Sequence, residues 1–374
     1  MQYSQLYITD LGADPIVLGS LNSIGSACSS VLTPLIGLMA DRYSLRRVIL
    51  LGLSFSVVIS AIYSFAGDWT HLILAIILSG TVVVFPFADV IFISYTKAER
   101  RGTVMALSRA ICGIPAIFTP MIAAVLVASF GGINASGIRP LYYLQMALST
   151  VVLLFVASKL RSPRITQSEE RLGLIQAFRE LLGSEKLLRR WMLLESLRRC
   201  GMAIAMPFTP LWMVKVKGAD PYILGVMGTV QTLISTLLQM PVGKLADRMG
   251  RKRAFYLLEP FNYLSTILLI LAPEPQYLIP VGLLAGIGGV SFIPFITMYW
   301  EMVPAEKRGR WFGVSGIFSI LSVPASILGG YLWERGYMIV VLLLPILMGA
   351  FLAIPILATI PETLRASRRE RGGL

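Results

Sequence analysis

The chain contains one long internal repeat, which limits the folds open to it more than any local pattern does. The eleven residues Gly243–Arg253 form a charged segment between two apolar runs, and a similar segment, Gly37–Arg47, stands 206 positions earlier. Self-similarity at a fixed offset predicts two structural units of the same kind, together spanning almost the whole chain. Two shorter motifs recur in the same way: Gly12–Pro15 returns 206 positions later as Gly218–Pro221, and Ala98–Gly102 returns 207 positions later as Ala305–Gly309.

The stretches between the polar segments are long enough to cross a membrane. Runs of roughly 20 apolar residues recur, and a helix of that length spans about 30 Å of hydrocarbon. The 374 residues are 56% hydrophobic and 14% charged, with a mean hydropathy of +0.74. Because lipid offers no partners to free backbone groups, the spans must be helical. We predict an all-α integral membrane protein with about 11 complete transmembrane helices.

The repeat also predicts how the chain is divided. We expect an N-terminal helical bundle at 1–160, a linker with an amphipathic surface helix at 161–190, a C-terminal bundle at 191–362 and a basic tail at 363–374. The first-half counterpart of the apolar run Trp191–Val214 is only the short segment before Asp10. Such a segment cannot span a bilayer, so the first helix is expected to be largely missing, either because the true start of the chain lies upstream of Met1 or because the protein has lost this helix.

The cationic residues predict the orientation. Of the 33 Lys and Arg residues, 26 lie at every second polar break or in the tail, whereas 4 lie at the intervening breaks. By the positive-inside rule, the first set faces the cytoplasm, which places the linker and the C-terminus there in a multi-pass protein of the plasma membrane. The net charge of +13 then reflects topology, and we expect no nucleic-acid partner.

Residues suited to catalysis or metal binding are scarce. The three cysteines lie within apolar runs, and the single histidine, His71, lies at the boundary of a span. The sequence contains no phosphate-binding loop, nucleophile elbow or zinc-binding histidine pair. We therefore predict no catalytic residues, no metal and no cofactor.

The repeated charged segment carries a family resemblance. Its pattern, G-x-x-x-D-R-x-G-R-[RK], followed two spans later by A-E-[RK]-R-G, resembles the signature of the major facilitator superfamily of secondary transporters. The first copy departs from it, with Ser44 in place of glycine and Leu45 in place of a basic residue. The resemblance covers the whole chain. It implies two pseudo-symmetric six-helix bundles, a monomer, and a small-molecule substrate moved with or without protons.

The resemblance also implies a cytoplasmic gate. In the family, the aspartates of this motif lock the two halves together while the cavity is open outward. Carried over, Asp41 and Asp247 would each pair with nearby arginines, and the glycines would leave room for a neighbouring helix. The alternative is that the charges only set the topology. The gate-motif residues are Gly37, Asp41, Arg42, Arg46, Gly243, Asp247, Arg248, Gly250 and Arg251.

Substrate or proton sites are sought among polar residues within spans that the repeat does not duplicate. An ionisable group in the membrane costs a few kcal/mol at least and points to function. Asp89 and Arg109 lie at similar depths, so they either pair structurally or serve transport, with Asp89 carrying a proton in a dry cavity. The candidates are Asn22, Asp89, Arg109, Glu195, Arg198 and Gln231.

Several of these candidates have a structural alternative. Glu195 and Arg199 are four residues apart on a helix, and their pairing would leave Arg198 as the freer charge for an anionic substrate. Asn22 and Gln231 either join helices or contact a ligand. Two further acids, Glu259 and Glu301, are expected to be latch partners on the inner surface.

Three functions stay open at this stage. Export of small amphiphilic compounds is favoured, because two proline-containing runs, Thr119–Ala124 and Pro324–Gly330, are similar to the exporter signature of the family. The alternatives are proton-coupled import of sugars or organic acids and a nutrient sensor that binds without transport. Aromatic and methionine-rich cavity walls would indicate the first function, and converging carboxylates and arginines the second.

Overall fold

The computed structural model describes residues 2–42, 45–82, 101–159, 186–302 and 319–363, with side chains for 3–32, 46–80, 113–159, 186–302 and 320–363. Every regular element in these ranges is helical. One set, here called the N-half, contains α1 (Gln2–Asp10), α2 (Pro15–Arg42), α3 (Leu45–Phe65), α4 (Leu72–Val82), α6 (Arg101–Ser129) and α7 (Ala135–Lys159).

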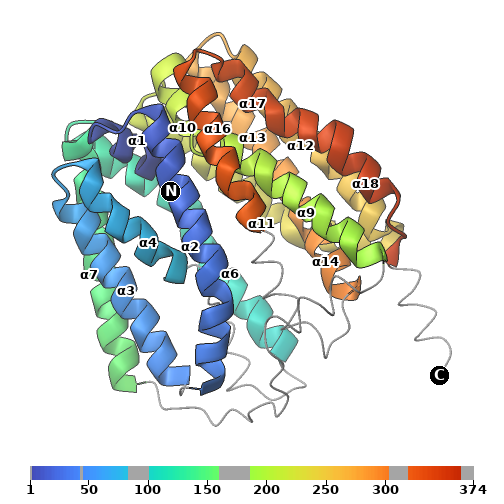
Figure 1. Cartoon of the computed structure of the whole chain (residues 1–374), viewed down its shortest axis with the longest axis horizontal. Helices are drawn as coiled ribbons and strands as arrows, with labels where there is room; N and C mark the ends of the chain where they lie inside the picture. The colour runs from blue at the N-terminus through green and yellow to red at the C-terminus, as the bar shows by residue number, and fades with distance from the viewer. Residues whose placement is uncertain (1, 43–44, 83–100, 160–185, 303–318, 364–374) are drawn as a thin grey trace.

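The remaining helices are here called the C-half, which lies beside the N-half in Figure 1. It contains α9 (Lys186–Ala205), α10 (Thr209–Leu211), α11 (Pro221–Met249), α12 (Arg251–Leu271), α13 (Leu278–Gly289), α14 (Phe292–Met302), α16 (Val323–Glu334), α17 (Met338–Leu347) and α18 (Ile354–Ala358). Short 3-10 turns occur at Trp69–His71, Pro275–Tyr277 and Ser319–Ser322, and π-helical turns at Trp212–Val216 and Met348–Ala353.

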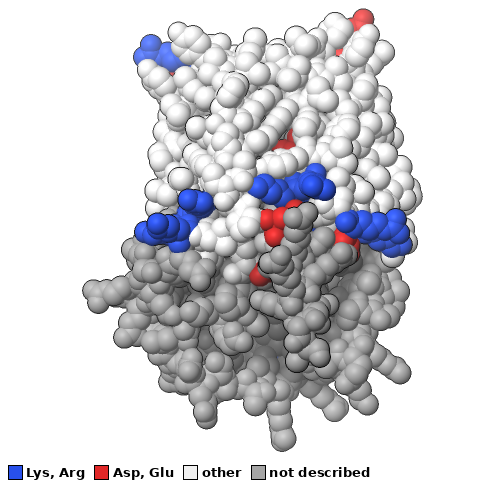
Figure 2. Space-filling view, turned by 90° about the vertical axis from the view of Figure 1, so that its right-hand side faces the viewer, with Lys and Arg blue, Asp and Glu red and all other residues white. Residues whose placement is uncertain are grey.

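The predicted all-α membrane fold is confirmed. Within the described residues, seven helical segments are long and apolar enough to cross a membrane, and two shorter apolar helices accompany them. Figure 2 shows Lys and Arg gathered in a band across one face, with a broad surface almost free of charge between this band and a few charges at the far end. We call the end of the helices that carries the following residues the basic end: Arg46, Arg189, Lys244, Arg248 and Lys252.

Some predicted boundaries were wrong. The repeated charged segment is not a polar break, because Gly243–Met249 continue α11 and α12 begins at Arg251. Only Gly250 separates the two helices, with a φ of 105° that favours glycine. Helix α9 begins at Lys186, inside the predicted linker, whose residues 161–185 lie outside the described ranges.

The repeated Gly-Ala-Asp-Pro motif forms the same helix start twice. Gly12 and Gly218 have positive φ angles of 94° and 70°. Asp14 and Asp220 each accept a hydrogen bond at 2.7 Å from the backbone N–H three residues later, and a proline follows each aspartate as the first helical residue. Aspartate satisfies a free N–H group of the first turn, and proline has none to satisfy. The motif therefore starts α2 and α11, at the end of the bundle opposite the basic end.

This helix start can be tested by mutation. We expect Asp220→Ala to lower the free energy of unfolding by about 1 kcal/mol, because one backbone N–H loses its partner. Thermal unfolding of the purified protein in detergent would measure the change. Asp220→Ser keeps a capping oxygen and should stay close to the wild type. Equal stability of the alanine and serine variants would contradict the capping role.

The two halves meet through a pair of related contacts. Helix α2 packs against α16, where a Cβ added at Gly19 would overlap the carbonyl oxygen of Ser326. Helix α11 packs against α6, where a Cβ added at Gly225 would lie 3.3 Å from the carbonyl oxygen of Pro120. Gly19 and Gly225 are 206 positions apart, and so are Pro120 and Ser326. The contacts thus exchange under the repeat, as a two-fold relation between the halves requires.

These contacts lie away from the basic end. Along α11, Gly225 packs tightly on α6, and farther on Thr236 lies 3.6 Å from a Cβ added at Gly113. One turn later Met240 is 71% exposed, and a Cβ at Gly243 would meet no heavy atom of the described residues within 4 Å. The described parts of the two halves therefore separate toward the basic end.

The short helix α1 is firmly packed at the opposite end. The Tyr7 hydroxyl is buried and donates to the carbonyl oxygen of Tyr63 at 2.8 Å, and Arg139 Nε donates to the Tyr7 oxygen at 3.2 Å. Asp10 accepts a hydrogen bond at 2.5 Å from the backbone N–H of Ala135, at the start of α7. Helix α1 thus joins α3 and α7.

Candidate functional site

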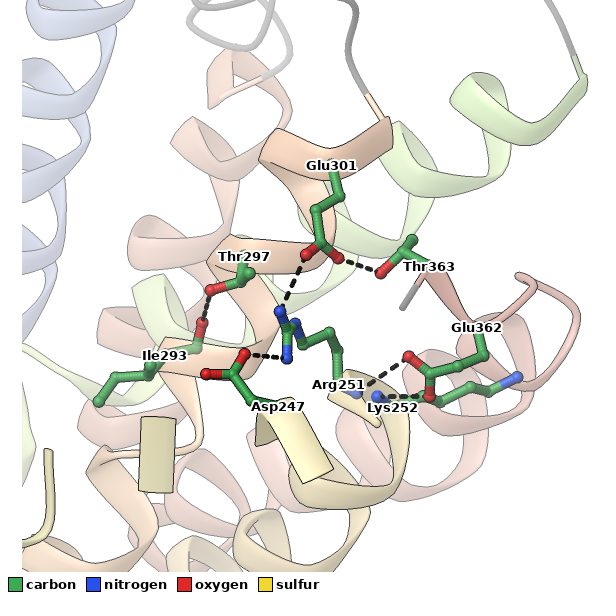
Figure 3. Close-up of polar contacts among 8 residues, drawn as sticks. All are labelled: Asp247, Arg251, Lys252, Ile293, Thr297, Glu301, Glu362 and Thr363. Carbon is green, nitrogen blue, oxygen red and sulfur yellow. Dashed lines mark hydrogen bonds and ion pairs between the residues drawn. The ribbon is translucent and has the colours of Figure 1, made fainter. Parts of the chain in front are cut away.

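A cluster of charged side chains joins several helices at the basic end of the C-half (Figure 3). The Arg251 guanidinium lies 2.5 Å from the carboxylate of Asp247 on α11 and 3.1 Å from that of Glu301 on α14. Glu301 also accepts a hydrogen bond at 2.5 Å from the Thr363 hydroxyl. We call this group the basic-end cluster: Asp247, Arg251, Lys252, Glu301, Glu362 and Thr363.

Glu362 fixes the start of α12. Its carboxylate accepts hydrogen bonds from the backbone N–H groups of Arg251 at 2.9 Å and Lys252 at 3.1 Å. These groups have no partner within their own helix, and a carboxylate at a helix N-terminus is favoured by the helix dipole. In return, Lys252 Nζ donates to the carbonyl oxygens of Ala358 at 2.7 Å and Ile360 at 2.8 Å. The end of α18 and the start of α12 are therefore bound to each other.

The N-half repeats part of this arrangement. Arg46 stands 206 positions before Lys252, and its Nη2 donates at 2.8 Å to the carbonyl oxygen of Ala157, near the end of α7. Arg46 thus corresponds to Lys252 rather than to Arg251, whose position is taken by Leu45. The expected latch of Asp41, Arg42 and Arg46 stays a prediction, because the side chains of Gly37, Asp41 and Arg42 lie outside the described ranges.

The second copy of the gate motif can be compared more fully. Asp247 pairs with Arg251, as the motif suggested, and Glu301 also contacts Arg251, while the role of these residues in a gate stays a prediction. Arg248 makes no ion pair with another residue whose side chain is described. No heavy atom of the described residues lies within 4 Å of a Cβ added at Gly243, so the close approach of a helix there stays a prediction.

Sequence reasoning missed Glu362 and Thr363. They stand at the boundary between the last apolar run and the basic tail, where no site was predicted. The sequence did offer one sign of such a site, the carboxylate of Glu362 just after the last apolar run.

The contact between Gly250 and Glu362 offers a sharp test. We expect Gly250→Ala to destabilise the protein, because a Cβ there would lie 2.6 Å from Glu362 Oε2 on a backbone with positive φ. Gly336 has a similar φ of 84°, and a Cβ added there would meet no atom of the described residues within 4 Å. Gly336→Ala should therefore lower the free energy of unfolding only by the backbone cost, about 1 kcal/mol. The additional loss of stability in Gly250→Ala should become smaller when Glu362→Ala is introduced as well, and thermal unfolding would measure it. Equal losses at both glycines would argue against the packing.

A second polar group, here called the Arg198–Glu259 network, lies inside the C-half. Arg198 Nη1 lies 2.8 Å from Glu259 Oε1, and Glu259 is only 6% exposed. The other oxygen of Glu259 accepts hydrogen bonds from the Ser291 hydroxyl at 2.7 Å and from Asn262 Nδ2 at 3.1 Å. The carboxylate therefore has partners on α9, on α12 and at the break between α13 and α14.

Aromatic rings and a broken helix surround this network. The Arg198 guanidinium carbon lies 5.1 Å from the ring centre of Phe255 and 4.5 Å from that of Phe295, distances typical of cation–π contacts. Asn262 Nδ2 also donates at 3.0 Å to the carbonyl oxygen of Gly288, which accepts the backbone N–H of Ser291 at the break as well. Broken helices lined by polar groups are common at the binding sites of secondary transporters.

Two expectations about these charges were wrong and one is confirmed. Glu195 and Arg199 pair at 2.8 Å, as predicted. Arg198 is not the freer charge, because it is bound to Glu259. Glu259 is not a latch partner at the inner surface, because it is buried between helices. The position 206 residues before it is Leu53, so the N-half has no copy of this pair.

The remaining candidates are less informative. Asn22 exchanges hydrogen bonds with Gln5 at 3.2 and 3.3 Å, which joins α2 to α1. Gln231 is half-buried on α11, and its backbone oxygen would lie 2.8 Å from a Cβ at Gly286. Asp89 and the side chain of Arg109 lie outside the described ranges, so their pairing and a proton-carrying role for Asp89 stay predictions.

Comparison with known sequences gives matches along the whole chain. A sequence model of the Major Facilitator Superfamily matches residues 3–197 and 191–373. "Multidrug resistance protein 3" of Bacillus subtilis (strain 168) is 32% identical over 109 residues, 28% of this chain and 21% of that protein. "Probable nitrate transporter NarT" of Staphylococcus aureus (strain JH9) is 29% identical over 135 residues, 33% of each chain. The aligned stretches thus span a fifth to a third of these relatives.

Comparison with solved structures supports the same fold. A point mutant of the nucleoside transporter NupG superposes with a TM-score of 0.77 at 15% identity, covering 96% of this chain and 95% of that one. NupG without this mutation gives a TM-score of 0.71 at 16% identity, with 96% of each chain covered. At such low identity the likeness shows the fold alone.

Proposed function

The chain belongs to the major facilitator superfamily, and on this premise we propose that it is a secondary active transporter of a small organic solute that works by alternating access. The observation that carries the proposal is the uneven contact between the halves. They pack tightly at Gly19 and Gly225, whereas Met240 is exposed and Gly243 has no neighbour among the described residues. Two units joined at one end and separated at the other can rock so that a central site opens to either side.

The direction of the opening follows from charge. The separated end is the basic end, which the positive-inside rule assigns to the cytoplasm. We therefore propose that this conformation faces inward. The contacts of Arg251 lie within the C-half, while the Asp247 side chain is 66% exposed. Asp247 is thus available to contact the N-half when this end closes.

The Arg198–Glu259 network supports a polar solute. A buried carboxylate and arginine converge there with Asn262 and Ser291 beside a broken helix. Such convergence favours import of sugars or organic acids over export of amphiphilic compounds. The exporter alternative has its own support, since Met202 on α9 and Met206 just after it are 57% and 60% exposed. The names of the relatives, which refer to multidrug resistance, nitrate and nucleosides, cover both classes.

Counterflow in liposomes tests the proposal. Purified protein would be reconstituted with one unlabelled solute inside and the same labelled solute outside, using a nucleoside, nitrate, an organic acid and a lipophilic cation in turn. We expect transient accumulation of one class without ATP, and none in liposomes without protein. Binding without flux would instead indicate the sensor.

The proposed latch gives a further prediction. We expect Asp247→Asn to lower the free energy of unfolding by no more than about 1 kcal/mol, because the Asp247 side chain is 66% exposed and the buried Arg251 keeps Glu301. It should nevertheless raise the labelling of cysteines reached from the cytoplasmic side, because the state that is closed at this end loses the carboxylate of Asp247. Asp220→Asn, the same change at the opposite end, is the control. Unchanged labelling would remove Asp247 from the gate.

A further inference from the structure

A groove runs along α11 where the halves diverge. It has a volume of about 330 Å³ and is lined by Met240, Pro241, Lys244, Leu245 and Arg248. Met240 follows Thr236 by one helical turn, so the groove continues the face of α11 that packs on α6 farther up. This face is covered at Thr236, and from Met240 onward no described residue of α6 is seen to pack on it.

The lining changes from apolar to cationic along the helix. Met240, Pro241 and Leu245 supply the apolar part, and Lys244 and Arg248 are exposed toward the basic end. The two cations are four residues apart on one helix, an arrangement that is destabilising by itself. Neither forms an ion pair with another residue in the ranges where side chains are described. An anion between them would relieve the repulsion.

We propose that this groove binds an anionic phospholipid, with the phosphate between Lys244 and Arg248 and one acyl chain along Met240, Pro241 and Leu245. The described lining comes from a single helix. The cations also lie within the last two turns of a membrane-spanning helix, at the depth of the head groups. Basic pockets between helices on this side are known to suit anionic head groups.

Native mass spectrometry of the detergent-purified protein, titrated with phosphatidylglycerol or phosphatidylcholine, tests the site. We expect phosphatidylglycerol to bind more tightly. Lys244→Gln/Arg248→Gln should weaken its binding about 30-fold, the equivalent of about 2 kcal/mol at about 1.4 kcal/mol per tenfold. The matched control is Arg189→Gln/Arg253→Gln, which removes two exposed cations at the same end outside the groove. It should leave binding unchanged within about twofold.

Two results would overturn the proposal. Equal affinity for the two lipids would show that the head-group charge is not recognised. An equal loss in the control variant would show attraction to the basic end in general. Met240→Gln, which keeps both cations, tests the apolar part and should weaken the long-chain lipid but not glycerol phosphate. The measurement needs no flux, so its outcome is independent of the transport proposal.

Discussion

Replacing Glu259 by alanine is expected to lower the free energy of unfolding by about 3–5 kcal/mol, the largest effect of any single change proposed for this chain. The substitution leaves Arg198 charged inside the C-half, together with the hydroxyl of Ser291 and the amide of Asn262, which all lose an acceptor. Thermal unfolding in detergent would measure the loss.

Two variants make this result specific. Glu259→Ala/Arg198→Ala removes both charges and should recover part of the stability, because no buried charge is left alone. Glu195→Ala breaks the more exposed pair of Glu195 and Arg199, in which the two side chains are 26% and 45% exposed. It should lower the free energy of unfolding by no more than about 1 kcal/mol. If Glu259→Ala were as mild as Glu195→Ala, the network would not be a buried ion pair.

Gly19→Ala and Gly225→Ala are expected to move the protein away from the conformation described here. Each added methyl group would overlap the other half, at the Ser326 carbonyl or at 2.5 Å from the Ala124 Cβ. Overpacking costs about 1–3 kcal/mol, which changes the ratio of two conformations roughly 5- to 150-fold. Since the cost falls only where the halves touch, we expect the end opposite the basic end to open.

Spin-label distances would report this opening. Labels at Gly67→Cys and Glu274→Cys lie on exposed loops of different halves, and the three native cysteines would be replaced by serine. Gly113→Ala is the matched control, because its Cβ would lie at an ordinary 3.6 Å from Thr236 on the same interface. A distance distribution unchanged by Gly19→Ala, or changed equally by Gly113→Ala, would contradict the role of the tight contacts.

The sequence predicted the features that the repeat duplicates. The Gly-Ala-Asp-Pro motif recurs because both α2 and α11 need a capped start, and the offset of 206 relates Gly19 to Gly225 at the contacts between the halves. Local chemistry of this kind can be recognised from residue types and spacing. The i,i+4 pair of Glu195 and Arg199 was predicted for the same reason.

Contacts between residues far apart in the sequence could not be predicted. Arg198 and Glu259 are 61 positions apart, and only the packing of α9 on α12 brings them together. Spacing gave each of them an incorrect role, one as a free cation and the other as a surface latch. The lack of described neighbours at Gly243 could not be predicted either, because it depends on the conformation and the sequence is the same in every conformation.

The bond between Glu362 and the start of α12 has a consequence for biosynthesis. The backbone N–H of Arg251 is capped by a carboxylate 111 residues farther along the chain. When α12 enters the translocon, Glu362 has not yet been synthesised. The hydrogen bond to Arg251 can therefore form only after the following spans have emerged from the ribosome. Until then, water or lipid head groups must accept hydrogen bonds from the exposed backbone N–H groups at the start of α12. Nascent chains arrested before Pro361 should therefore leave the beginning of α12 more open to proteases than the finished protein does.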